Sequence, residues 1–195
     1  MRRPSKSKSG TSIPSKAMPR RGTIPARSLP EALDTPTDLP SNAVAALSGS
    51  INKLLADAFA LYVKTKNFHW HMSGPHFRDY HLLLDEQADQ IFATTDPLAE
   101  RVRKLGGKTL RSISDISRHQ TLKDNDEEFV SPRDMLLELV ADNKAMAHAL
   151  REAHDLCDEH EDVATASLLE MYIDDTERRT WFLFEASRDA DMSGH

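Results

Sequence analysis

The sequence predicts an all-α protein, a four-helix bundle with a short extra helix in the crossover between the second and third helices. Three observations lead to this prediction. The chain has 195 residues, which suits one domain and a tail. Its 7 glycines are few for a β-rich protein, whose many turns would need more. Long segments lack Gly and Pro and carry apolar residues at spacings of three and four, the period of one helical face.

Two long helices are expected in the first half of the chain. The first should begin near Ser41, a residue type that often caps helices, and should end at the turn Ser73-Gly74-Pro75. The second is expected over about 75–105, where Gly106-Gly107 stops it. Pro97 interrupts this second helix. Because proline lacks a backbone N–H, we expect a kink or local loosening just before it.

Two more long helices are expected in the second half, after a short helical piece in the crossover. Apolar residues at 110, 113 and 116 predict the short piece. The third long helix should begin at Ser131-Pro132, a capping residue followed by proline in the first turn. The fourth is expected over about 162–187. The bundle domain therefore spans 41–187, and 188–195 are expected to form a short flexible C-terminus.

Residues 1–40 are expected to form a disordered basic tail, because they hold too few large apolar side chains to offset the entropy of ordering. Within 1–30 there are eight basic residues and no acid. The rest of the chain carries all 31 acids and a net charge of −14. A basic arm on an acidic body is typical of contact with a polyanion. The basic residues of the arm are Arg2, Arg3, Lys6, Lys8, Lys16, Arg20, Arg21 and Arg27.

The cysteine content and hydropathy indicate a cytoplasmic protein. Cys157 is the single cysteine, so no disulfide can form within the chain, which fits a reducing compartment. No run of about 18 apolar residues is present, so no membrane contact is expected. The N-terminus lacks the apolar stretch of a signal peptide.

Two pairs of possible metal ligands lie on the second predicted helix. His81 and Asp85 are four residues apart, as are Asp96 and Glu100, so each pair lies on one helical face. The two pairs are about 16 Å apart along the helix and cannot bind one metal within a chain. If the helix packs antiparallel to its copy near Gln90, a two-fold axis brings opposite pairs together. Imidazole and carboxylate ligands suit Fe(II), and also Mn(II) or Zn(II).

Other histidine patterns favour metal binding less. His154, Cys157 and His160 form an H-x-x-C-x-x-H run, but its ends point about 120° apart on a helix, so zinc is disfavoured there. His71 and His76 fall off the pattern and are expected near the surface. The chain contains no Glu-x-x-His, the motif of the di-iron site inside a single bundle. A site shared between subunits is therefore favoured.

One set of residues carries a family signature: Lys66-Asn67-Phe68-His69-Trp70, His81, Asp85, Asp96, Ala99-Glu100-Arg101 and Gly106-Gly107. This set resembles the ferroxidase signature of the Dps family (DNA-binding proteins from starved cells), and the resemblance extends over 41–187. It implies a ferritin-like four-helix bundle that assembles into a hollow dodecamer. It also implies that His69, His81 and Asp85 come from one subunit and that Asp96 and Glu100 come from its two-fold mate.

The resemblance further implies an activity. These five residues would act as metal ligands and catalytic residues that oxidise Fe(II) to Fe(III), preferentially with hydrogen peroxide, and the ferric iron would be stored inside. Consuming iron and peroxide together would protect DNA from oxidative damage. Trp70 follows His69 and is expected to pack close to the metal, where it could accept stray oxidising equivalents. Some members of the family bind DNA through basic N-terminal tails, which implies a nucleoid-associated protein that contacts phosphates without reading bases.

Two other functions stay open from the sequence. A structural nucleoid protein could compact DNA through the tail while its metal site stays idle. A divalent-metal buffer could bind zinc or manganese without redox turnover. The tail itself could serve solubility or targeting. The sequence also leaves open whether oxygen or peroxide is the oxidant, and whether one or two irons bind at each site.

Overall fold

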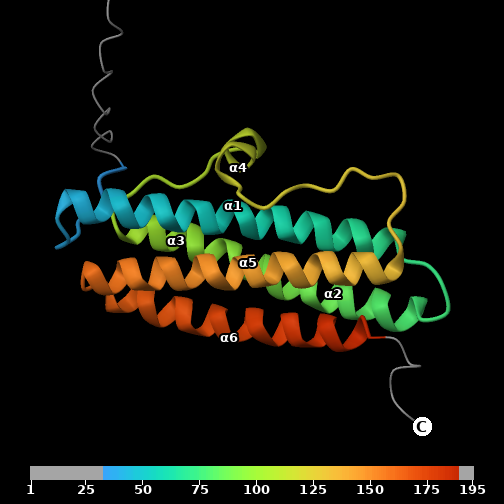
Figure 1. The fold of residues 1–195 in the computed structure, drawn as a ribbon. Coiled ribbons are helices and arrows are strands. Elements are labelled where there is room, and N and C mark those ends of the chain that lie inside the picture. Colours follow the sequence, from blue (N-terminus) through green and yellow to red (C-terminus); the bar gives the residue numbers. More distant parts are fainter. Residues whose placement is uncertain (1–32, 189–195) are drawn as a thin grey trace, which may run out of the picture.

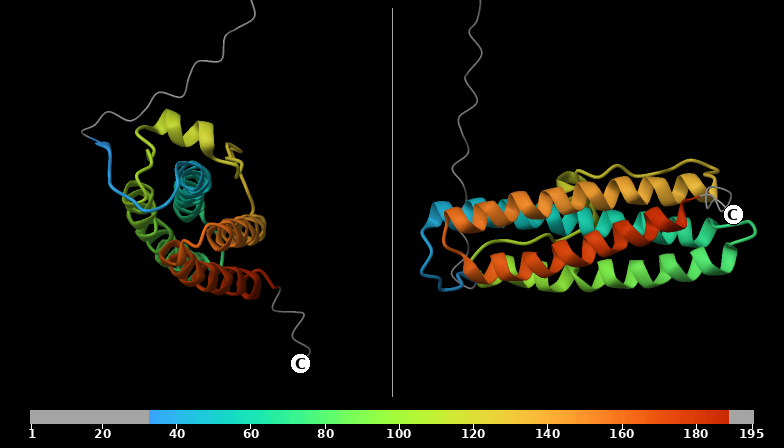
Figure 2. Two further views of the ribbon diagram at one scale, coloured as in Figure 1. Left: turned by 90° about the vertical axis from the view of Figure 1, so that its left-hand side faces the viewer. Right: turned by 60° about the horizontal axis from the view of Figure 1, so that its bottom comes forward.

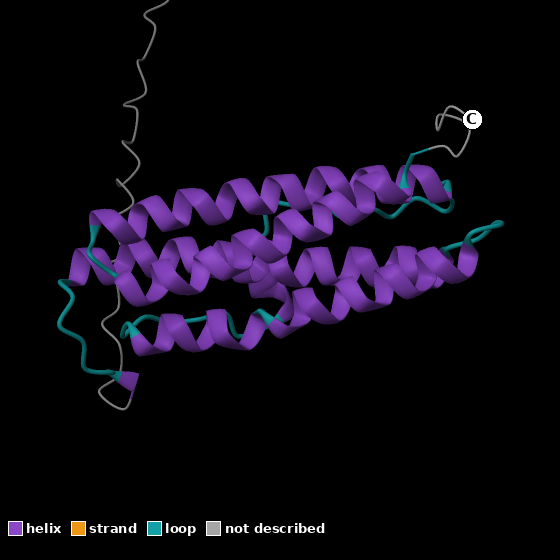
Figure 3. Cartoon of the chain, turned by 90° about the horizontal axis from the view of Figure 1, so that it is seen from below, coloured by secondary structure: helices purple, strands orange, loops and turns teal. Residues whose placement is uncertain are grey.

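The computed structural model describes residues 33–188, and this part of the chain is helical without strands (Figure 3). Three long helices and one broken helix lie side by side, and a short helix lies across the outside of the first (Figures 1 and 2). The predicted all-α four-helix bundle with a short helix in the crossover is therefore confirmed. The helices are α1 (Ser41–His71), α2 (Phe77–Ala93), α3 (Thr95–Lys104), α4 (Ile113–His119), α5 (Pro132–Glu159) and α6 (Val163–Ala186).

The start of α1 differs in one detail from the prediction. The helix begins at Ser41, but Pro40 occupies the N-cap position and no side chain caps the first turn. Pro40 has φ −66° and ψ 151°, the extended conformation that an N-cap residue needs. The backbone of Pro40 also accepts a hydrogen bond of 3.1 Å from Val44 N. Ser41 is thus the first helical residue rather than the cap.

A side chain caps α5 as the sequence predicts, and a side chain also caps α6. Ser131 Oγ accepts a hydrogen bond of 3.2 Å from the backbone N–H of Asp134, at the start of α5. Asp162 Oδ1 accepts one of 3.1 Å from the backbone N–H of Thr165, at the start of α6. Each bond satisfies one of the N–H groups that the first turn of a helix leaves without a partner.

The break between α2 and α3 lies just before Pro97, as predicted. Thr94 N donates to Ile91 O at 3.1 Å, a bond three residues back that tightens the turn. Proline has no N–H to donate to the carbonyl of Ala93, so the regular ladder is interrupted there. α3 nevertheless continues along the direction of α2, and the two together form one side of the bundle (Figure 2).

The core runs along α1. Leu47, Leu54, Leu61 and Phe68 recur every seven residues and are at most 2% exposed. They form one continuous apolar seam that faces the other helices. By length and composition alone α1 could cross a membrane, but 61% of its apolar window is buried inside the bundle, as in the core helix of a soluble protein.

The crossover spans the length of the bundle, because α3 ends near the start of α1 and α5 begins near its end (Figure 1). Asp57 on α1 holds the middle of the crossover in place. The Asp57 carboxylate, 2% exposed, accepts hydrogen bonds from Thr121 N at 2.5 Å, Thr121 Oγ1 at 2.7 Å and Leu122 N at 2.9 Å. A buried carboxylate is stable only with such donors, so these bonds hold the chain onto α1.

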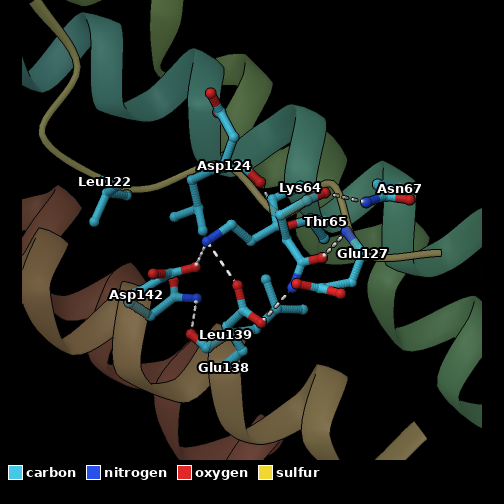
Figure 4. Close-up of polar contacts among 12 residues, drawn as sticks. Lys64, Thr65, Asn67, Leu122, Asp124, Glu127, Glu138, Leu139 and Asp142 are labelled. Carbon is cyan, nitrogen blue, oxygen red and sulfur yellow. Dashed lines mark hydrogen bonds and ion pairs between the residues drawn. The ribbon is translucent and has the colours of Figure 1, made fainter. Parts of the chain in front are cut away.

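A buried lysine adds a second anchor (Figure 4). Lys64 Nζ lies 2.9 Å from Glu138 Oε1 and 2.8 Å from Asp142 Oδ2, which joins α1 to α5. Burial lowers the pKa of Lys64, but its hydrogen bonds to Asp142 and Glu138 outweigh burial and raise it, so the ammonium stays charged. Asn125 Nδ2, in the crossover, donates to Glu138 Oε2 at 2.8 Å. One polar network thus connects three segments that are distant in sequence.

Residues 33–40, assigned to the tail from the sequence, lie against the end of α3. Arg103 Nη2 donates to Leu33 O at 2.7 Å and to Thr35 Oγ1 at 3.0 Å. Gly106 has φ +85°, and a Cβ there would come within 3.0 Å of Thr35 O. The guanidinium thus satisfies polar groups of this segment and holds it on the body. The eight basic residues of the tail, in 1–32, and residues 189–195 lie outside the described part.

We expect Asp57→Asn to destabilise the fold by about 2–3 kcal/mol, because its amide nitrogen would face backbone donors in a buried place. Urea unfolding followed by circular dichroism measures this loss. Asp174→Asn, on the exposed face of α6, makes the same chemical change and should leave the midpoint within about 0.5 kcal/mol of the wild type. Equal stability of the two variants would contradict the anchoring role of Asp57.

Candidate metal centre

Two predicted ligands, His69 on α1 and His81 on α2, meet at the end of these helices. Their rings stack with centroids 3.7 Å apart and planes 21° apart. His69 Nδ1 lies 2.8 Å from His81 O, and His81 Nδ1 lies 2.9 Å from His69 O. A carbonyl only accepts, so each Nδ1 must carry a proton and donate. In the neutral rings each Nε2 then keeps its lone pair, the state required of a metal ligand.

Asp85 lies one helical turn beyond His81 and completes a half-site of three residues. Asp85 Oδ1 is 3.7 Å from His69 Nε2, and its side chain is 45% exposed. His69 is buried, so the half-site has a fixed inner wall and an open outer edge. The structure therefore brings together, within one chain, three of the five predicted ligands.

Lys66 belongs to the family signature, but the sequence reasoning gave it no role in the site. Its Nζ lies 2.5 Å from Asp85 Oδ1. The hydrogen bond from Lys66 lowers the pKa of Asp85, which keeps this carboxylate ionised. Lys66 precedes His69 by three residues on α1, so helical spacing places both on one face, and this was the signal available.

The other two predicted ligands lie apart from this half-site. Asp96 and Glu100 are one turn apart on α3, and both are exposed. Glu100 Oε2 pairs with Lys104 Nζ at 2.9 Å. Within residues 33–188 of a single chain, no three His, Cys, Asp or Glu side chains are placed to hold a metal ion. One chain thus carries the predicted ligands as two separate groups.

Trp70, which the sequence reasoning expected to pack close to the metal, lies at the surface of the single chain. It is 63% exposed and lines a hollow of about 380 Å³ with Val63, His71 and the crossover residues 124–127. In the described part of the chain it makes no ring contact with either histidine of the half-site, because successive residues on a helix point about 100° apart. Phe77 packs on His81 instead, with ring centroids 4.9 Å apart.

The H-x-x-C-x-x-H run on α5 separates in space. His154 Nε2 faces Glu170 Oε1 of α6 at 3.3 Å. Cys157 points into the core, is 1% exposed, and burial raises the pKa of its thiol to about 12. A thiol with this pKa stays protonated at neutral pH and is a poor metal ligand. The arrangement gives no support to zinc binding by this run.

Comparison with known proteins defines the family. Residues 49–191 match the model of the ferritin-like domain. A DNA protection during starvation protein from Agrobacterium fabrum is 36% identical over 149 residues, which are 76% of this chain and 92% of that protein. The chain belongs to the Dps family. The matched region includes all five predicted ligands.

Solved Dps structures share the fold. A Dps from Thermosynechococcus elongatus superposes with a TM-score of 0.75 at 26% identity, covering 80% of this chain and 98% of that one. An archaeal Dps homologue from Halobacterium salinarum gives a TM-score of 0.76 at 27% identity and covers 85% of this chain and 93% of that chain. The ferritin-like fold predicted from the sequence is therefore confirmed.

We expect Lys66→Gln to tighten the binding of Co(II), used as a redox-stable probe, by about three- to five-fold at pH 7. The substitution removes the cation that competes for Asp85, while the pKa of that carboxyl, though it rises, stays acidic. Isothermal titration calorimetry measures the change. Lys53→Gln, on an exposed part of the same helix, removes the same charge and should leave the affinity unchanged. Unchanged or weaker binding by Lys66→Gln would contradict the competition.

Proposed function

We propose that this Dps-family protein oxidises Fe(II) to Fe(III) at a site shared by two subunits and stores the ferric product inside a hollow oligomer, a dodecamer in its expected form. The observation that carries the proposal is the pair of reciprocal Nδ1–carbonyl bonds of His69 and His81. These bonds use the Nδ1 atoms and leave both Nε2 atoms to bind a metal, and His69 Nε2 lies 3.7 Å from Asp85 Oδ1. The half-site is thus arranged for a cation while lacking the further ligands that would complete it.

A two-fold axis supplies the missing ligands. Asp96 and Glu100 are exposed on the rod formed by α2 and α3, beyond the half-site along the same rod. An antiparallel pair of such rods, crossing near Gln90, would bring these carboxylates of one subunit to the His69–His81–Asp85 group of the other. Each pair of subunits would then hold two identical sites.

The proposed ligand set suits iron oxidation. Two imidazoles and three carboxylates bring three negative charges, and hard anionic oxygen ligands stabilise Fe(III) more than Fe(II). With hydrogen peroxide as oxidant the reaction balances as 2 Fe(II) + H2O2 + 2 H2O → 2 FeO(OH) + 4 H+. Two iron ions each give one electron, the O–O bond breaks, and iron and peroxide are consumed together. Such consumption would limit hydroxyl-radical formation near DNA.

The opposite side of the bundle offers a surface for further assembly. A groove of about 670 Å³ between α5 and α6 is lined by apolar side chains together with Lys144, Arg151, Glu177 and Thr180, and Trp181 there is 61% exposed. Large exposed apolar patches mark protein interfaces. With the proposed two-fold contact along α2 and α3, a second contact on α5 and α6 would extend dimers into a closed shell.

Non-specific DNA binding is the second proposed function, and the charge distribution favours it. The eight basic residues of the tail suit phosphate contacts, whereas the body, with its net charge of −14, repels DNA. An oligomer presents many tails, and multivalency strengthens weak contacts. The rival function is a structural nucleoid protein of the cytoplasm whose metal site is idle. The geometry of His69 and His81 argues against idleness, because it keeps two metal-binding lone pairs in place.

The shared site can be tested by mixing subunits. Anaerobic Fe(II) loading followed by peroxide should give rapid ferric absorbance in the wild type, and His81→Ala with Asp85→Ala should abolish it. Asp96→Ala with Glu100→Ala should also abolish it. When the two inactive proteins are unfolded and refolded together, roughly a quarter of the wild-type sites should return, because each mixed pair regains one intact site.

The control is each inactive protein refolded alone, which should stay inactive. If the mixture also stayed inactive while assembling normally, the ligands would not be shared between subunits. If either double variant kept the wild-type rate, iron would be oxidised elsewhere, and the structural nucleoid function would become the better account.

Deleting residues 1–30 should abolish the retardation of DNA in a gel and leave the rate of iron oxidation unchanged, since the ligands lie in the body. For the intact protein, retardation should weaken steeply as salt rises, because phosphate contacts release counter-ions. A variant that replaces the eight basic tail residues by glutamine keeps the length and tests charge alone. Equal retardation by the deleted and intact proteins would rule out the tail as the DNA-binding element.

A further inference from the structure

A buried arginine lies in the middle of the bundle, away from the candidate metal centre. Arg179 on α6 is 4% exposed. Its Nε donates to Asn143 Oδ1 on α5 at 3.1 Å, and its Nη2 donates to Thr176 Oγ1 at 2.6 Å. Gln87 Nε2 on α2 donates to the backbone carbonyl of Arg179 at 3.4 Å. Three helices therefore contribute polar side chains to one place in the core.

The remaining nitrogen of this guanidinium has no partner. Arg179 Nη1 is buried and makes no hydrogen bond within the described part of the chain. Arg179 also lines a cavity of about 10 Å³, room for a single small sphere, whose walls include Leu61, Ile91 and Leu150. Arg179 makes no ion pair among residues 33–188, although the carboxylate of Asp175 acts on its charge from a longer distance.

The same cavity has donors that would attract a cation if the arginine were absent. Asp175 and Tyr172 line it on the α6 side, and Asp175 is exposed, which gives a route from the surface. Asn143 and Thr176 add an amide oxygen and a hydroxyl oxygen close by. Oxygen ligands of this kind bind hard divalent cations. Burial lowers the pKa of Arg179 to about 10, so the guanidinium remains charged at neutral pH.

The position of Arg179 in the bundle indicates what its charge does. Ferritin-like carboxylate proteins that bind two metals inside one bundle place glutamates and Glu-x-x-His pairs on inward faces of their four helices. Here the inward positions carry Gln87, Asn143, Thr176 and Arg179. We propose that Arg179 is a specificity-determining residue that keeps divalent cations out of the bundle core and leaves the subunit interface as the place where iron binds.

The exclusion of cations from the core rests on this chain alone, whereas confinement of iron to the interface rests on the proposed function. The test uses Co(II), which stays divalent in a buffer free of peroxide. The chains tested also carry His81→Ala and Asp85→Ala. In this background the interface site is removed. Cobalt that binds in the core is then measured without a contribution from the interface. The result for the core therefore holds even if the interface site proposed above does not exist.

We expect Arg179→Glu in this background to bind one additional Co(II) per chain, about tenfold or more tighter than any binding by the parent. Arg179→Gln removes the charge and keeps an amide that can reach Asn143, so it should gain the same site with lower affinity. Cobalt anomalous diffraction should place the ion beside Asp175. Arg178→Glu, an exposed neighbour whose guanidinium lies 4.8 Å from the Phe182 ring, makes the same charge change and should gain no core site.

The outcomes separate clearly. Cobalt in the core of either Arg179 variant, and absent from Arg178→Glu, supports the proposal. No cobalt in the core of a folded Arg179→Gln or Arg179→Glu protein would overturn it, because the charge would then not be what excludes the ion. Cobalt in the core of the parent would overturn it as well. Circular dichroism establishes which variants are folded, and Arg179→Gln carries the test if Arg179→Glu unfolds.

Discussion

The rotation of α1 about its own axis is the constraint on which the rest of the structure depends. The seam of Leu47, Leu54, Leu61 and Phe68 must face the core, and this requirement leaves one orientation for a 31-residue helix. In that orientation, one flank presents Asp57 and Lys64 to the crossover and α5. The other flank presents Lys66 and His69 to α2. Apolar burial on one side of α1 thus decides where its polar side chains point.

The buried polar contacts then convert this orientation into a specific site. A buried carboxylate or ammonium without partners costs free energy. Asp57 and Lys64 therefore favour the one path of the crossover that supplies their partners. On the α2 side, the reciprocal bonds between His69 and His81 join two backbones through two side chains. The two histidines proposed as ligands are therefore held by the same contacts that align the helices.

Local patterns in the sequence were sufficient for the helices, the break before Pro97 and the two ligand pairs, because spacing along one helix determines which residues share a face. Contacts between helices were not accessible in the same way. Lys66 reaches Asp85 across 19 positions, and Phe77 packs on His81. The segment 33–40 was assigned to the tail from its composition, yet Arg103, some 70 positions away, holds it. Arg179 carried no visible signal, since an arginine in a helix usually points to solvent.

Lys66 and Arg179 differ in how easily a metal cation could displace their positive charges. Lys66 approaches a carboxylate that is 45% exposed, and its long flexible stem lets the ammonium move into water when a divalent ion takes Asp85. Arg179 is held by bonds from two of its three nitrogens inside the core, where its departure would leave Asn143 Oδ1 without a donor. On the proposed function, the displaceable charge of Lys66 would permit metal binding at the interface, whereas the fixed charge of Arg179 would oppose it in the core. The place of metal binding would then depend on which of the two cations can leave.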